Sequence, residues 1–172
     1  MQWHRFHYRG SSGAAHADWV ALDLEDTTDN GWGLGTRPKA VGTLSGSFDL
    51  SSRDADTQEQ IDRFVDIAIN YTNKDVRDSG DPDQYAASAI SRIALINAAD
   101  IPPMRLYNSD AETMPHQQMD QFKSALNNRG FVNVVATQIE GALHAFHYWH
   151  TEITPGVTIG QDVITFLNTH LL

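Results

Sequence analysis

The sequence of 172 residues is 41% hydrophobic and 20% charged, which is typical of a globular protein with a core of its own and excludes a disordered chain. Its 12 Lys and Arg against 22 Asp and Glu give a formal charge of −10 at pH 7, so nucleic acid and anionic membranes are not expected as partners. No run is long enough to span a membrane, and the first residues lack the apolar core of a signal peptide. We therefore expect a soluble protein, either cytoplasmic or, if the true N-terminus is missing, secreted. The absence of cysteine excludes disulfides and thiolate chemistry.

Segments with strand character alternate with segments of helical periodicity along the chain. The expected strands are residues 3–9, 40–44, 104–107 and 131–139. The expected helices are residues 14–24, 85–96, 115–129 and 160–171. Residues 25–38, rich in Gly, Asp and Thr, are expected to form a loop. This alternation predicts a single α/β domain, residues 1–172, with a mostly parallel sheet and helices on both faces.

The segment at about 51–82 differs in character from the rest of the chain. Apolar residues recur at helical spacing, at Ile61, Phe64, Val65 and Ala68, and charged loops flank them. This pattern predicts a helical excursion outside the sheet, as in a lid-like insert.

The turn after the first expected strand contains two neighbouring serines among small residues. A serine at a strand-to-helix turn is the arrangement of a nucleophile elbow, because strained backbone exposes the hydroxyl and the following helix directs N–H groups at developing negative charge. Ser12 has Gly10 and Ala14 two positions away, whereas Ser11 has Arg9. Sterics alone therefore favour Ser12. A simple turn with a helix cap is the alternative interpretation.

Two later loops that follow expected strands also carry reactive groups. Residues 108–114 contain Asp110 and Glu112, and residues 140–146 contain His144. In a parallel sheet such groups gather at the carboxyl ends of the strands. Serine, then acid, then histidine is the chain order of one known catalytic triad.

With these segments in this order, the chain resembles the C-terminal portion of an α/β-hydrolase, closest to the esterase and lipase members. The matching pieces are residues 11–16, similar to a Ser-Ala-Gly-Ala-x-His elbow, residues 41–50, similar to the strand and turn after the elbow helix, the acid loop running into Met114-Pro115, and residues 141–149. The resemblance covers nearly all of the chain. It implies a serine hydrolase that cleaves small-molecule carboxylic esters through an acyl-enzyme, without a cofactor or metal.

The resemblance also implies roles for the serines and the histidine. Ser11 is the expected nucleophile because Gly13 and His16 then fall in register with the elbow, and Ser12 is the alternate. The N–H of Ser12 is expected to donate to the oxyanion. His144 is the expected general base.

The acid of the triad has two candidates. An alignment on the proline puts the family's aspartate at Ala111, which cannot serve. A shift of one residue gives Glu112, favoured for its longer stem, or Asp110 as the alternate. Acids that only cap a turn beside a helix start are the alternative interpretation. A metal site is not expected, because histidines at a uniform spacing of three, residues 144, 147 and 150, drift around a helix.

The family fold has further strands before the elbow, and a loop among them supplies the second oxyanion donor. The resemblance therefore implies a fold that lacks the N-terminal strands and exposes a sheet edge at residues 3–9. That edge predicts self-association or a complementing N-terminal half as a partner. The rival functions are a non-catalytic fragment or partner-dependent half, and a transferase or peptidase on the same fold.

Overall fold

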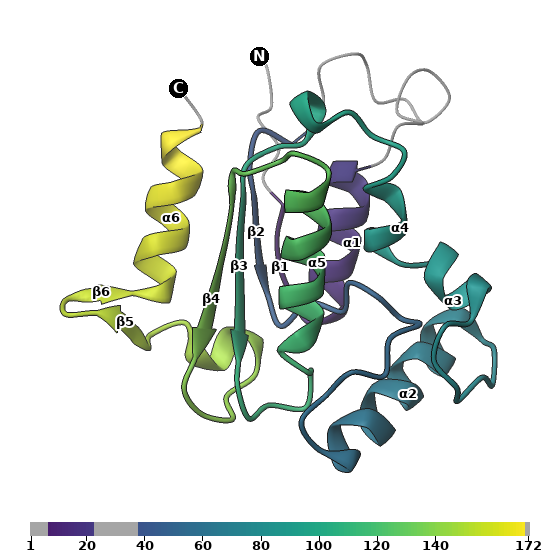
Figure 1. Ribbon diagram of the computed structural model, residues 1–172. Helices are drawn as coiled ribbons and strands as arrows, with labels where there is room; N and C mark the ends of the chain where they lie inside the picture. Colours follow the sequence, from purple (N-terminus) through teal and green to yellow (C-terminus); the bar gives the residue numbers. More distant parts are fainter. Residues whose placement is uncertain (1–6, 23–37, 171–172) are drawn as a thin grey trace.

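A computed structural model describes residues 7–22 and 38–170, and its centre is a single four-stranded sheet (Figure 1). All pairs are parallel, in the spatial order β1-β2-β3-β4. The strands are β1 (His7–Gly10), β2 (Val41–Leu44), β3 (Met104–Ser109) and β4 (Val134–Ile139). Because neighbouring strands run the same way, their carboxyl ends meet at one edge of the sheet. The expectation of a parallel sheet is confirmed; residues 3–6 of the first expected strand lie outside the described residues.

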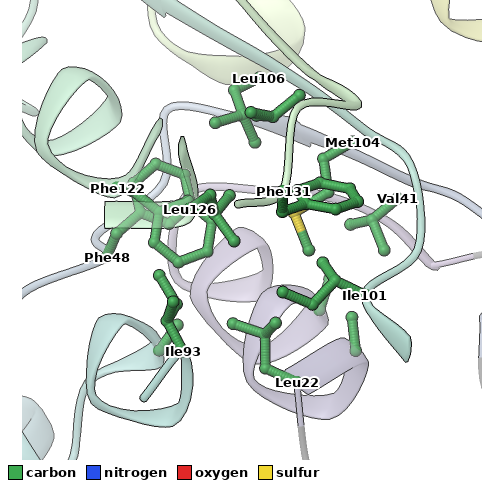
Figure 2. Packing of buried hydrophobic residues seen from close by; sticks show 14 of the residues in the cluster. Leu22, Val41, Phe48, Ile93, Ile101, Met104, Leu106, Phe122, Leu126 and Phe131 are labelled. Carbon is green, nitrogen blue, oxygen red and sulfur yellow. The ribbon is translucent and has the colours of Figure 1, made fainter. Parts of the chain in front are cut away.

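One face of the sheet is covered by α1 (Ser12–Leu22) and α5 (Gln117–Asn128) (Figure 1). Side chains of a strand alternate between the two faces, and on this face Val41, Met104 and Leu106 are buried. Figure 2 shows them packed with helix residues such as Leu22 and Phe122. This cluster forms the larger part of the core.

The opposite face packs against α6 (Ile159–Thr169). Leu44, Tyr107 and Ile139, from three neighbouring strands, form a second buried cluster with Val163 of this helix. The two clusters confirm the prediction that helices cover both faces of the sheet.

The segment predicted as an excursion contains α2 (Gln58–Thr72), which lies beside the lower end of the sheet in Figure 1. Thr57 and Gln60 form a capping box at its start. Its apolar side packs Phe64 and Ala68 against Leu50 and Met114. Met114 belongs to the predicted acid loop, so α2 supports that loop from the side. A lid-like role for the segment stays a prediction.

The single helix expected at 85–96 is wrong. Two short helices, α3 (Pro82–Ala86) and α4 (Ala89–Arg92), are separated by Ala87 and by Ser88, whose backbone is extended. The Ser88 hydroxyl donates to Gln84 O at 2.7 Å and accepts the N–H of Leu50, also at 2.7 Å. The local bond to Gln84 O and the bond from Leu50, in another segment, replace the helical continuation that periodicity predicts.

Other element boundaries also differ from expectation. Helix α5 begins at Gln117 with His116 as its N-cap, so Pro115 precedes the helix rather than opening it. Strand β4 begins three residues later than expected, and α1 begins two residues earlier. The remaining elements are the short helices η1 (Ala98–Asp100) and η2 (Ala145–Tyr148) and an unpredicted antiparallel hairpin, β5 (Glu152–Thr154) with β6 (Val157–Thr158). Among residues 7–22 and 38–170, no helix combines the length and apolarity that a membrane span requires.

Candidate active site

Ser11 occupies the tight turn between β1 and α1. Its φ of 57° lies in the left-handed region, where a residue with a side chain is strained. The turn is fixed by the Ser11 N–H, which donates to Leu44 O at 2.8 Å, and by the Ser11 carbonyl, which accepts the N–H of Ala14 at 2.8 Å. Ser12 is instead the first residue of α1. Of the two candidate serines, Ser11 is therefore the strained residue of the strand-to-helix turn.

Glu112 is a buried carboxylate with three donors around it. It is 2% exposed. One oxygen, Oε1, accepts the hydroxyl of Ser45 at 2.7 Å and the N–H of Ser109 at 2.9 Å. The other oxygen, Oε2, contacts Nδ1 of His144. These contacts replace the hydrogen bonds to water that burial removes.

The acid loop is closed by two buried amide side chains. Asn108, at the end of β3, donates from its side chain to Met114 O at 2.9 Å and so joins the two ends of the loop. Gln60 of α2 donates to Glu112 O at 2.9 Å. The backbone around Glu112 is thereby fixed from both sides.

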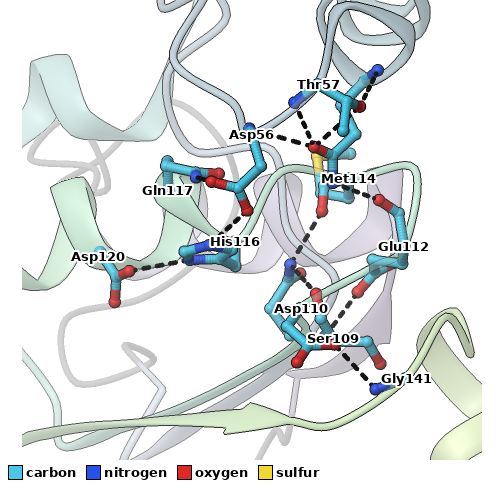
Figure 3. A network of polar contacts seen from close by, with 12 residues as sticks. Asp56, Thr57, Ser109, Asp110, Glu112, Met114, His116, Gln117, Asp120 and Gly141 are labelled. Atoms are coloured by element: carbon cyan, nitrogen blue, oxygen red, sulfur yellow. Dashed lines mark hydrogen bonds and ion pairs between the residues drawn. The ribbon is translucent and has the colours of Figure 1, made fainter.

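The acid loop and the histidine loop are hydrogen-bonded to each other along their length. Asp110 accepts the N–H of Gly141 on Oδ1 at 2.8 Å, as Figure 3 shows, and Ala111 N–H donates to Gly141 O at 3.0 Å. The Ser109 hydroxyl donates to Leu143 O at 2.7 Å. The carboxylate of Asp110 is thus engaged with backbone, while the structure brings Glu112 to the histidine.

The turns that follow β1, β2 and β3 each continue the sheet ladder by one bond. Ser11 N–H donates to Leu44 O of β2, Ser45 N–H to Tyr107 O of β3, and Asp110 N–H to Ile139 O of β4, all at 2.8–2.9 Å. Along the carboxyl edge the serine turn therefore starts beside the Ser45 turn, and the Ser45 turn beside the acid loop. The acid loop starts beside the end of β4, where the histidine loop begins. Ser45 was not among the site residues predicted from the sequence; its signal is the Ser-Gly-Ser turn that ends β2.

The histidine itself is partly open to solvent. The His144 side chain is 34% exposed, and its apolar neighbours Leu143 and Phe146 are about half exposed, at 49% and 54%. The next residue, Ala145, has a φ of 50°, so the backbone is strained beside the histidine as it is at Ser11. Within residues 7–22 and 38–170, no group of three or more His, Asp or Glu side chains gathers at metal-binding distances.

Helix α1 carries a second buried carboxyl group, Asp18. It is 0% exposed, and neither oxygen has a hydrogen-bond partner among the residues that the structure describes. Burial without donors raises the pKa of Asp18 well above its ordinary value. The group is therefore driven toward its neutral form.

Comparison with known proteins gives structural likeness without sequence likeness. No family model matches the sequence, and no curated protein matches it. Solved structures that match include an acetyl ester-xyloside bifunctional hydrolase from Caldicellulosiruptor lactoaceticus (TM-score 0.65, 13% identity) and a thermophilic esterase from Thermogutta terrifontis with propionate bound (TM-score 0.56, 20% identity). The alignments cover 96% and 95% of this chain but 56% and 53% of those chains. The chain thus has an α/β-hydrolase-like fold and spans about half the length of these structures.

Proposed function

We propose that the chain carries the catalytic groups of a serine hydrolase that cleaves carboxylic esters through an acyl-enzyme. The observation that carries the proposal is the buried Glu112 carboxylate against Nδ1 of His144, at the same sheet edge as the strained turn of Ser11. Two structures of similar fold are those of an acetyl ester-xyloside bifunctional hydrolase and an esterase, which supports the same class of chemistry.

In the proposed reaction, Ser11 Oγ attacks the carbonyl carbon of the ester. Nε2 of His144 takes the hydroxyl proton as the new C–O bond forms, and returns it to the leaving alcohol as the old bond breaks. Glu112 at Nδ1 fixes the tautomer and stabilises the imidazolium. Water, activated by the same histidine, then releases the acid and restores the serine.

The negative charge on the carbonyl oxygen needs donors in fixed positions. The N–H of Ser12, at the start of α1, is the proposed donor, assisted by the helix dipole. Loss of one such donor costs roughly 10²–10³ in rate. Because the chain spans about half of the matched structures, its activity alone is proposed to be lower than that of a protein with a complete set of donors.

The proposed substrate carries an apolar or aromatic group beside the ester. Leu143 and Phe146 flank the base and remain about half exposed, although large apolar side chains tend to be buried. Short-chain aryl esters offer both a good leaving group and apolar area, so they are the first substrates to test against peptides.

A fluorophosphonate probe tests the proposal directly, because it phosphonylates a serine only where a base activates it. We expect labelling of wild-type protein, mapped to Ser11 by mass spectrometry, loss of labelling in Ser11→Ala and in His144→Gln, and retention in Ser51→Ala. Labelling at Ser12 instead would reassign the nucleophile. No labelling, under conditions that label a control esterase, would favour the second candidate function, a non-catalytic or partner-dependent half, which the partial coverage of the matched structures supports.

A further inference from the structure

The hydroxyl of Ser45 is a junction between the acid and the histidine loop. It donates to Glu112 Oε1 at 2.7 Å and accepts the N–H of Ala145 at 2.9 Å. The hydroxyl of Tyr148 lies 3.0 Å away on a third side. A hydroxyl has one hydrogen and two acceptor positions, so Glu112 and Ala145 use its hydrogen and one of those positions. The Tyr148 hydroxyl, which lies beside the other position, also donates to Tyr107 O at 3.1 Å. Ser45 is 0% exposed, so bulk water does not reach this hydroxyl.

The backbone conformation at Ser45 suits glycine better than serine, which indicates that this position holds serine for its hydroxyl. Its φ is 53°, a conformation that glycine adopts freely and other residues rarely do. Among the described residues, the non-glycine positions with positive φ are Ser11, Ser45, Asn73 and Ala145. Asn73 caps α2, where such a conformation is usual. The other three lie at the candidate site, where strain is retained for function.

Ser45 Oγ is bonded both to the carboxylate of Glu112 and to the backbone next to His144. A carboxylate free to rotate could present either oxygen to the histidine, but Ser45 and the N–H of Ser109 hold Oε1, so Oε2 faces the ring. Ala145, bonded to the same hydroxyl, directly follows His144 in the chain. We infer that Ser45 is a positioning residue that sets the geometry of the Glu112–His144 pair. Its effect on turnover rests on the proposed function, whereas its effect on the geometry of the pair does not.

Two variants remove the hydroxyl in different ways. Ser45→Ala keeps the strained backbone, and Ser45→Gly removes the hydroxyl where the backbone suits glycine, so the second variant is expected to fold even if the first does not. Ser51→Ala is the matched control. Ser51 is also a buried serine that donates to a carboxylate, Asp49 Oδ1 at 2.6 Å, but it lies in another segment.

The readout is the far-downfield proton resonance of His144 Nδ1–H, assigned by its absence in His144→Gln. We expect a resolved resonance at low temperature in the wild type and in Ser51→Ala. We expect broadening or loss through exchange with water in both Ser45 variants, whose remaining spectra stay dispersed. Retention of the resonance in Ser45→Gly overturns the inference. Its absence from the wild type also overturns it, because the contact on which the inference depends would then not form.

Kinetics separates this inference from the proposed function. With an aryl ester, Ser45→Gly is expected to lower kcat on the order of 10²-fold with little change in KM, since misplacement of a base affects the transition state more than binding. If the probe labels the wild type but Ser45→Gly keeps both the resonance and kcat, the hydrolase function is supported and the positioning role of Ser45 is contradicted. If no serine is labelled but the resonance is broadened or lost in the Ser45 variants, the positioning role of Ser45 is supported and the hydrolase function is contradicted.

Discussion

Two regions of this molecule hold a buried carboxyl group, and they differ in whether hydrogen-bond donors surround it. At the ends of β3 and β4, Glu112 receives a hydroxyl, a backbone N–H and an imidazole. In α1, Asp18 is equally buried, but neither of its oxygens has a partner among the described residues. Burial alone therefore does not mark a reactive carboxylate; the donors around it do.

The same two regions differ in how they fix a reactive group. The acid and the histidine are held by side-chain hydrogen bonds from three loops, whereas Ser11 is held by the backbone geometry of its turn. A side-chain network is broken by removing one polar atom, and a strained turn is altered by changing backbone preference. Substitutions that separate these effects test the comparison.

The largest expected effect is on turnover in Glu112→Gln. An amide cannot stabilise the imidazolium and can favour the wrong tautomer, so kcat for an aryl ester should fall about 10⁴-fold. Asp110→Asn is the matched control: its amide oxygen can still accept the N–H of Gly141, and its effect should be far smaller. Steady-state kinetics of both variants measures the two losses in kcat. Equal losses, or a larger loss in Asp110→Asn, would assign the acid to the wrong residue.

Asp18→Asn should stabilise the protein at neutral pH. Burial raises the pKa of Asp18. The free energy of unfolding of the wild type is therefore highest below the unfolded pKa of about 4, and it falls as pH rises toward the folded pKa. The advantage of Asn should therefore grow with pH in that window, by up to about 1.4 kcal/mol per unit. Urea unfolding at several pH values measures it.

Asp81→Asn gives the contrasting control for that measurement. The N–H of Gln84, and then Lys74, lower the pKa of Asp81, so its contribution is present above the unfolded pKa and lost as pH falls. Its replacement by Asn should therefore destabilise at neutral pH. A gain for Asp18→Asn that does not vary with pH would show that the carboxyl group is not the cause.

At the serine turn, Ser11→Gly should be more stable than Ser11→Ala by about 1 kcal/mol, because glycine tolerates a φ of 57°. Both should lose probe labelling. At Ser45, with a similar φ of 53°, glycine also removes a hydroxyl that donates and accepts in the interior, so Ser45→Gly should be destabilised relative to wild type. Chemical denaturation of the three variants measures the difference. Equal responses at the two serines would contradict the distinction between backbone and side-chain fixation.

The smallest expected effect is on substrate binding in Phe146→Ser. The ring is 54% exposed, so its loss should change stability little. If it contacts the apolar group of the substrate, KM for an aryl ester should rise several-fold with kcat nearly unchanged. Val132→Ser, an exposed apolar residue outside the histidine loop, is the control. An unchanged KM would remove Phe146 from the substrate site.

Much of the fold could be predicted because its signals are local. Apolar runs mark β2, β3 and β4, and the periodicity of Phe64, Val65 and Ala68 marks α2. The break between α3 and α4 could not be predicted, because it depends on a bond that the Ser88 hydroxyl accepts from the N–H of Leu50, 38 residues away. The hairpin of β5 and β6 is too short for a periodic signal.

The site divides in the same way between local and distant information. The strand ends and the order of Ser11, Glu112 and His144 could be read from the chain, and the resemblance assigned their roles. The choice between Glu112 and Asp110 depends on which carboxylate meets the ring, which spacing does not determine. Ser45 was overlooked because its bonds reach residues 67 and 100 positions away.

The parallel order of the four strands has a consequence for how the protein acquires its shape. Every neighbouring pair in the sheet is joined by a crossover, and the groups at its carboxyl edge come from segments between residues 11 and 145. The entropic cost of closing long loops must be met before such distant strand pairs gain their stabilising contacts. Refolding should therefore be slow compared with that of a helical bundle of this size. Recovery of the His144–Glu112 contact during refolding should therefore report the late docking of β3 and β4 rather than early collapse.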